Sequence, residues 1–136
     1  MRAIDTNVLV RALVGDDAAQ AARAQALLAN HDIFIPVTVI LELEWVLRSR
    51  YAFTPAVVAQ AIEKIAALGN VVVGERAAVL AAAARALQGW DFADALHHAL
   101  SEGCDDFSTL DEDLLKRSKR PGLSGTMKVA PAIVKL

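Results

Sequence analysis

The feature that most constrains the fold is an alternation between very short apolar runs and longer segments with helical signals. Four runs of three or four mostly apolar residues stand at 2–5, 33–35, 71–73 and 107–110. Runs of this length, bounded by turn-forming or capping residues, are typical of short buried strands. Strands that alternate with helices form parallel sheets covered by helices. The sequence therefore predicts an α/β fold, a single α/β/α sandwich with a short parallel sheet of four to five strands.

Capping residues and glycines divide the rest of the chain into helices. Asp17 precedes an Ala-rich segment, Thr54-Pro55 has the form of a helix start, and Gly15 follows a helical pattern, as caps and stops do. The expected helices cover residues 6–13, 16–29, 36–51, 54–68, 75–87 and 91–103. Residues 119–125 are expected to form a loop, and residues 127–130 a short fifth strand.

The length and the cysteine content exclude several classes of protein. The 136 residues are expected to form one domain, residues 1–136, with room for a hydrophobic core. No apolar run reaches the roughly 20 residues of a membrane span, and Asp5 interrupts any signal-peptide pattern at the start. Cys104 is the only cysteine, which excludes an intrachain disulfide and a cysteine-based zinc site. A cytoplasmic protein with no membrane contact is expected.

Charge is distributed unevenly along the chain. The net charge is −2, but residues 1–115 carry a balance of −8 and residues 116–136 a balance of +6. A basic segment of this kind is either a polyanion contact or a solvated tail. The charge pattern alone leaves both interpretations open.

Four acidic residues stand where an α/β sheet builds its binding edge. Asp5 and Asp111 stand at the ends of predicted strands, Glu42 lies in the second turn of a helix that follows a strand, and Asp94 lies in the first turn of its helix. Ligands of α/β sheets bind beyond the carboxyl ends of the strands, so these acids can converge. Packed carboxylates repel one another, and a hard divalent cation removes that repulsion. Oxygen ligands alone favour Mg²⁺ or Mn²⁺ over zinc, which predicts a site for hydrolysis at phosphorus.

Four segments carry a resemblance to a known family. They are IDTNVLVRAL with Asp5, LELEWVLRSRY with Glu42, DFADALHHA with Asp94, and FSTLDEDL with Asp111. Each motif alone is weak, whereas four in this order and spacing are specific. In these segments the chain resembles the PIN-domain ribonucleases, specifically the VapC-type toxins of bacterial toxin–antitoxin pairs. The resemblance implies Mg²⁺- or Mn²⁺-dependent cleavage of RNA, a homodimer, and an antitoxin that blocks the cleft.

The resemblance also assigns roles to individual residues. It implies that Asp5, Glu42, Asp94 and Asp111 are the metal-binding acids of the catalytic site. Asn7 and Thr109 correspond to the family's supporting polar residues, expected to orient carboxylates or metal-bound waters. Asp113 is the reserve candidate for the fourth acid, but Asp111 is favoured because it directly follows the strand. Since an acidic edge repels RNA unless cations flank it, we expect the basic residues just beyond this acid to bind RNA phosphates: Lys116, Arg117, Lys119 and Arg120.

Several neighbouring residues have plain structural interpretations. Thr6 or Asn7 is expected to cap the first helix, which leaves Asp5 for the metal. Asp91 is expected to cap the helix that carries Asp94. Glu44 is expected at the surface or paired with Arg48. Four aromatic side chains are expected to serve packing or an interface: His97, His98, Trp45 and Trp90.

Two other functions remain to be weighed. The first is a phosphohydrolase or phosphotransferase with Asp5 as nucleophile, but Asn7 stands where haloacid-dehalogenase-like enzymes have a second aspartate. The second is a non-catalytic module that binds RNA or protein on the same fold. Loss of one of the four acids would favour it, and all four are present.

Overall fold

The computed structural model describes residues 1–119 and 131–136. The chain forms two compact units, Met1–Arg76 and Ala77–Leu136, and each unit is described by itself. In the described part of the chain, no helix has the length and apolar character needed to cross a membrane.

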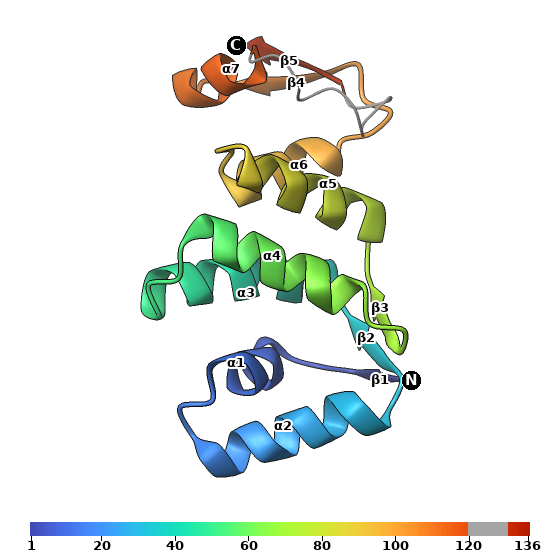
Figure 1. The fold of residues 1–136 in the computed structure, drawn as a ribbon. Coiled ribbons are helices and arrows are strands. Elements are labelled where there is room, and N and C mark those ends of the chain that lie inside the picture. Colours follow the sequence, from blue (N-terminus) through green and yellow to red (C-terminus); the bar gives the residue numbers. More distant parts are fainter. Residues whose placement is uncertain (120–130) are drawn as a thin grey trace. The chain divides into compact units, whose positions relative to one another are not determined.

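The first unit contains a three-stranded parallel sheet and four helices. Its elements are β1 (Arg2–Ala3), α1 (Thr6–Val14), α2 (Ala18–Asn30), β2 (Ile33–Ile35), α3 (Val37–Arg50), α4 (Pro55–Ala66) and β3 (Val71–Val73). The strand order is β1-β2-β3, with Arg2 opposite Ile33 and Ile33 opposite Val71. Figure 1 shows the three strands side by side, and α1 packs against α2 and α3.

The second unit contains a two-stranded parallel sheet and helices. Its elements are α5 (Arg76–Leu87), which begins at the unit boundary, α6 (Phe92–Ala99), β4 (Asp106–Thr109), α7 (Glu112–Ser118) and β5 (Ala132–Lys135). Strands β4 and β5 pair with Asp106 opposite Ala132 and Thr109 opposite Lys135. The predicted α/β fold with short parallel strands is therefore confirmed, with the strands divided between sheets of three and two.

Local sequence signals set most helix boundaries. Asp17 Oδ1 accepts a hydrogen bond from Gln20 N at 3.0 Å, and Thr54 Oγ1 accepts one from Val57 N at 3.2 Å. Gly15 ends α1 with a φ of +70°, which is costly for other residues. Each of these bonds satisfies a backbone group that a helix end leaves unpaired.

Each unit has its own apolar core. In the first unit, fully buried side chains come from β2, α3 and α4: Ile33, Ile35, Ile40, Leu43, Leu47, Val58 and Ile62. In the second unit the core is built of smaller residues: Val79, Ala82, Ala83, Ala95 and Leu96. Burial of one Leu or Ile side chain contributes about 1.5–3 kcal/mol, so these side chains stabilise the packing of the helices and strands within each unit.

Two sequence expectations at the C-terminal end need correction. The predicted strand at residues 127–130 lies outside the described residues, and the observed β5 begins at Ala132. Helix α7 was not predicted, although Asp111 and the two acids after it form an ordinary helix start. The predicted loop at residues 119–125 also lies, except for Lys119, outside the described residues.

Candidate metal centre

Asp5 lies two residues beyond β1 and is the N-cap of α1. Its Oδ1 accepts a hydrogen bond from Thr6 N at 2.7 Å, and its side chain is exposed. The expectation that Thr6 or Asn7 would cap this helix was wrong, because the chain is already helical at Thr6. The cap occupies one carboxylate oxygen, so capping and a second role for this acid are compatible.

Thr6 joins the two acidic residues of the first unit. It is 3% exposed, and its hydroxyl donates a short hydrogen bond to Glu42 Oε1. Because Thr6 N also donates to Asp5 Oδ1, one residue holds both carboxylates. The sequence marked Thr6 only as a possible cap. Its bridging role was missed, because the contact joins residues 36 positions apart.

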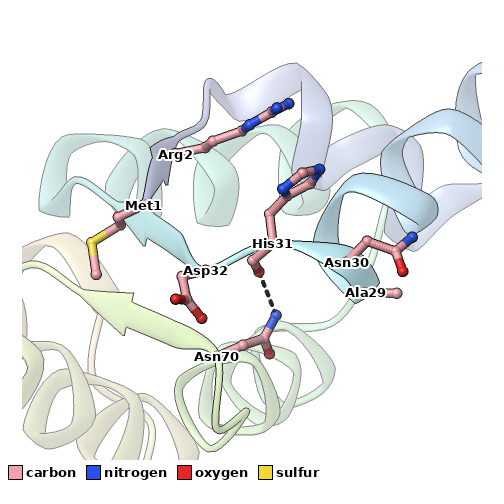
Figure 2. Close-up of a pocket in the computed structure, with 7 residues that line it drawn as sticks. All are labelled: Met1, Arg2, Ala29, Asn30, His31, Asp32 and Asn70. Atoms are coloured by element: carbon pink, nitrogen blue, oxygen red, sulfur yellow. Dashed lines mark hydrogen bonds between the residues drawn. The ribbon is translucent and has the colours of Figure 1, made fainter.

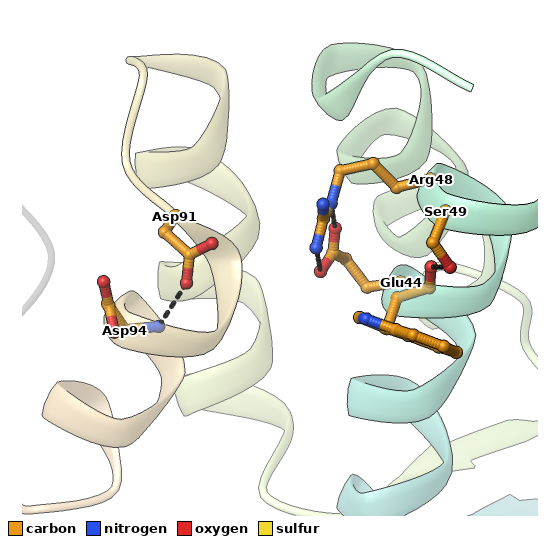
Figure 3. A network of polar contacts seen from close by, with 6 residues as sticks. Glu44, Arg48, Ser49, Asp91 and Asp94 are labelled. Atoms are coloured by element: carbon orange, nitrogen blue, oxygen red, sulfur yellow. Dashed lines mark hydrogen bonds and ion pairs between the residues drawn. The ribbon is translucent and has the colours of Figure 1, made fainter. Parts of the chain in front are cut away.

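Helix α3 carries two glutamates with different environments. Glu42 is exposed, whereas Glu44 is 4% exposed. Arg48 Nε donates to Glu44 Oε2 at 2.7 Å, one turn along the helix (Figure 3). The expected pairing of Glu44 with Arg48 is confirmed, but Glu44 is buried rather than at the surface. The positive charge of Arg48 compensates the burial of Glu44. Because Glu44 is already paired within α3, Glu42 is the glutamate on this helix that is available to a ligand.

Asn7 lies at a groove between α1 and α2. The groove has a largely apolar lining that includes Val8, Ala24 and Leu27, and Arg11 stands beside it. Asn7 is exposed there. Its expected role in orienting a carboxylate remains a prediction.

Asp94 occupies the first turn of α6, behind a separate capping residue. Asp91 is the N-cap, and its Oδ2 accepts a hydrogen bond from Asp94 N at 3.0 Å (Figure 3). The prediction that Asp91 caps this helix is confirmed, and the metal-binding role of Asp94 stays a prediction. Burial raises the pKa of Asp94, and the negative charges of Asp91 and Asp111 raise it further. Asp94 and Asp111 therefore form a repelling carboxylate pair within the second unit.

Asp111 follows β4 and caps α7. Its Oδ1 accepts hydrogen bonds from Asp113 N at 2.9 Å and Leu114 N at 3.2 Å. Thr109 Oγ1 in turn accepts a hydrogen bond from Asp111 N at 3.0 Å. The hydroxyl that the sequence singled out thus fixes the backbone of the acid after it. Asp113 is exposed on the first turn of α7.

Positive charge stands close to this second pair of acids. Lys116 and Arg117 lie in the last turn of α7, and Lys119 is its C-cap. His97 and the guanidinium of Arg117 each lower the pKa of Asp94, but the effects that raise this pKa are larger. Arg120, the fourth predicted RNA-binding residue, lies outside the described residues.

The donor atoms suit a hard divalent cation. Each unit supplies one pair of carboxylates, Asp5 with Glu42 and Asp94 with Asp111. Among the residues that the structure describes, no group of three or more His, Cys, Asp or Glu side chains forms a metal site. Burial and the charges of Asp91 and Asp111 raise the pKa of Asp94, and a cation bound beside this carboxylate would favour its ionised form. Oxygen-only donors of this kind match Mg²⁺ or Mn²⁺.

A polar pocket lies at the other edge of the three-stranded sheet. It is lined by residues at the amino ends of the strands, among them Arg2, His31, Asp32 and Asn70 (Figure 2). Asn70 Nδ2 donates to the backbone carbonyls of Leu28 and His31 at 2.6 and 2.8 Å, which ties the segment before β3 to the C-terminal end of α2. The pocket lies at the amino ends of the strands, whereas α/β proteins bind ligands at the carboxyl ends, and its lining contains none of the four candidate metal-binding acids.

Comparison with known proteins assigns the chain to a family. The model of the PIN domain matches residues 3–120, a range that contains all four acids. No curated protein and no solved structure gave a significant match. The match covers most of the sequence and parts of both units. The chain therefore belongs to the PIN domain family.

Proposed function

We propose that this protein is a metal-dependent endoribonuclease and the toxin of a type II toxin–antitoxin pair. Members of the PIN family are generally metal-dependent nucleases, so a nuclease activity follows from membership. The observation that supports the metal-dependent chemistry is that Thr6 makes hydrogen bonds to both Asp5 and Glu42. Acids from two distant segments are held as a pair, which a purely structural cap does not require.

In this proposal residues 1–136 act as one nuclease domain, and Asp5, Glu42, Asp94 and Asp111 are its metal-binding acids. Asp5, Asp94 and Asp111 hold Mg²⁺ or Mn²⁺, and Glu42 either holds it or accepts a proton from the attacking water. When bound, the cation supplies a Lewis acid for phosphodiester hydrolysis. Its charge would also favour the ionised form of Asp94, whose pKa is raised by burial and by the charges of Asp91 and Asp111.

Other side chains would position these acids. Thr6 holds the orientation of Glu42 through its hydroxyl, and Thr109 fixes the backbone of Asp111. Asn7 is proposed to orient a carboxylate or a metal-bound water. Such supporting hydrogen bonds set the direction in which ligand oxygens point.

RNA is the proposed substrate, and the basic end of the chain its proposed contact. Lys116, Arg117 and Lys119 lie on and just after α7, and Arg120 follows them in the sequence. The proximity of Arg117 to Asp94 favours a phosphate held next to the acids. Homodimer formation, control by a cognate antitoxin and a cytoplasmic location belong to the same proposal.

Cleavage of total cellular RNA tests the proposal directly. We expect cleavage with Mg²⁺ or Mn²⁺ and none with EDTA, and loss of cleavage in the Asp5→Asn and Asp94→Asn variants. Asp17→Asn is the matched control, since Asp17 is the N-cap of α2 as Asp5 is the N-cap of α1. Full activity in EDTA would overturn the mechanism, and a trapped aspartyl-phosphate would favour the phosphotransferase instead.

A further inference from the structure

A buried polar cluster in the second unit plays no part in the proposed nuclease site. Arg85 on α5 is 7% exposed and His98 on α6 is 5% exposed. The His98 ring is stacked on Trp90 at 6.4 Å between centroids and meets the edge of Phe107 at 5.5 Å. The Arg85 guanidinium lies 4.7 Å from the centre of the Trp90 ring. A buried guanidinium next to a buried imidazole needs a specific arrangement of hydrogen atoms.

Hydrogen-bond chemistry fixes the protonation state of His98. Arg85 Nη1 lies 2.7 Å from His98 Nδ1. Since a guanidinium only donates hydrogen bonds, Nδ1 accepts and carries no hydrogen. The other ring nitrogen, Nε2, lies 2.6 Å from the carbonyl oxygen of Pro131. A carbonyl only accepts, so Nε2 carries the hydrogen and the ring is the neutral Nε2–H tautomer.

A second proton on the His98 ring is unfavourable, because both ring nitrogens already have hydrogen-bond partners. It would sit on Nδ1 and face the N–H of Arg85 at a separation that suits only a donor with an acceptor. It would also place two positive charges together in a buried site. Trp90 and Phe107, the aromatic neighbours, carry no charge, and the contact from β5 is the Pro131 carbonyl. Among the groups that the structure describes, Arg85 is the charged side chain that acts on His98.

The titration of His98 agrees with this geometry. Burial lowers the pKa of His98, and the charge of Arg85 lowers it further. The Pro131 carbonyl opposes these effects, because it accepts a stronger hydrogen bond from the charged ring than from the neutral one. The neutral ring is thus the favoured form at physiological pH.

We propose that Arg85 and His98 form a pH-sensitive clasp that holds the start of β5. A proton on Nδ1 of His98 faces the N–H of Arg85 and drives the ring out of its buried site, and the Pro131 carbonyl is released with the ring. Pro131 immediately precedes β5, and its carbonyl is the point that the clasp holds. Strand β5 pairs with β4 along its whole length. It is also tied to α7 by the Lys135–Glu112 ion pair at 2.6 Å, whose two side chains are exposed and therefore bind weakly.

The consequence of opening is local. Release of Pro131 leaves β5 held by a four-residue ladder and one exposed ion pair. Two-stranded pairings are marginal by themselves, so the β4–β5 amides are expected to exchange with solvent more readily. Asp111 lies two residues after β4, so acidification would loosen the strand that leads to it.

Two measurements on the full chain test the clasp. The ¹⁵N spectrum of the His98 imidazole at pH 7.5 should show a hydrogen on Nε2 and none on Nδ1. Hydrogen exchange of the β4–β5 amides, corrected for the intrinsic effect of pH, should then be followed between pH 7.5 and 5. Between the ordinary pKa of histidine and the lowered pKa of His98 in the closed protein, linkage to one proton increases opening by up to about tenfold for each pH unit.

The histidine pair supplies a matched control. His98→Gln keeps one donor and one acceptor but does not titrate in this range, so its β4–β5 exchange should no longer depend on pH. His97→Gln changes the adjacent exposed residue and should behave as the wild type. Exchange in the wild type that is independent of pH, or a pH dependence retained in His98→Gln, would overturn the clasp. If His98→Gln does not fold, the wild-type imidazole spectrum still decides, because a hydrogen on Nδ1 at pH 7.5 contradicts the proposed contact.

Discussion

At the scale of single residues, one aspartate side chain often has two possible roles here. Asp5 and Asp111 each cap a helix through one oxygen, while the proposed function requires their charge. Asparagine caps a helix about as well as aspartate, whereas alanine does not. Substitution by each residue therefore separates the structural role from the chemical one.

We expect Asp5→Asn and Asp111→Asn to lose RNA cleavage with little change in the free energy of unfolding. Asp5→Ala and Asp111→Ala should lose cleavage and also about 1 kcal/mol of stability, through loss of the cap. Urea unfolding and RNA cleavage measure the two effects separately. Asp17→Ala is the control, because it should lose similar stability and keep its activity. Cleavage retained by both asparagine variants would mean that these residues are caps alone.

Asp94 is expected to cost stability when it is ionised without a cation. Its pKa is raised in the folded protein by burial and by two acidic neighbours. The folded state therefore binds the proton more tightly than the unfolded state, and stability falls as pH rises through the window above the ordinary pKa of aspartate. Asp94→Asn should be more stable than the wild type at pH 7 without metal, and this advantage should vanish near pH 3. A lower melting temperature of Asp94→Asn at pH 7 would contradict the expectation.

The sequence identified some site residues well and missed others for a physical reason. Asp91 as the cap of α6 and the pairing of Glu44 with Arg48 are local patterns within one turn of helix, and both were predicted. Thr6 was missed as a bridge because its partner Glu42 comes from a distant segment. The burial of Glu44 was missed because it depends on how other elements cover α3. Contacts between distant segments leave little trace in a single sequence.

At the scale of elements, boundaries were predictable where a cap or a glycine marks them. Strands β2 and β3 lie where the sequence predicted them, and α2 and α4 begin after Asp17 and Thr54 as expected. Helix α7 has only seven residues, too few for a periodic pattern to show. Strand β5 has exposed and half-buried residues, so it lacks the apolar pattern of a core strand.

Helix α7 carries the test of the RNA contact. Replacement of Lys116, Arg117, Lys119 and Arg120 by serine should weaken RNA binding and flatten its dependence on salt. Each lost phosphate contact to a single strand removes about 0.7 from the slope of log affinity against log salt. Filter binding over a series of salt concentrations measures this slope. Arg2→Ser with Lys64→Ser, two exposed cations elsewhere, is the control. Unchanged affinity and slope in the α7 variant would make this segment a solvated surface.

Helix α3 presents the most conspicuous candidate for a protein contact. Trp45 is 51% exposed, with the Arg50 guanidinium 6.0 Å from its ring centre. The sequence predicted core or interface packing for Trp45, and its exposure excludes the core. Trp90, by contrast, is 4% exposed and lies in the core as predicted. A large exposed aromatic side chain is typical of interaction surfaces.

We therefore expect Trp45→Ala to weaken homodimer formation. Loss of an aromatic anchor costs about 2 kcal/mol or more, roughly a thirtyfold change in the dissociation constant. Sedimentation equilibrium at several concentrations measures the change. Val72→Ala removes an exposed apolar side chain from β3 and should leave association unaltered. Equal dissociation constants for Trp45→Ala and the wild type would place the dimer contact elsewhere.

At the scale of the whole molecule, the sequence predicted the class of fold but not the pairing of the strands. Alternating strands and helices were sufficient to indicate a parallel α/β arrangement. The division into a three-stranded and a two-stranded sheet depends on which strands pair. Pairing is decided by contacts between distant segments, so composition and periodicity do not determine it.

The last expectation concerns the effect of the proposed metal on the stability of the whole chain. A ligand that binds only the folded state stabilises it by mass action, by about 2.7 kcal/mol at 100 times its dissociation constant. Asp5 belongs to the first unit and Asp94 to the second, and the proposed function counts both among the metal-binding acids. Thermal unfolding with and without Mg²⁺ should show a rise in melting temperature that Asp5→Asn and Asp94→Asn each reduce and Asp17→Asn retains. A variant of Asp5 or Asp94 that kept the full Mg²⁺ effect would exclude that residue as a metal ligand, because a ligand oxygen that is lost must lower the affinity for the cation.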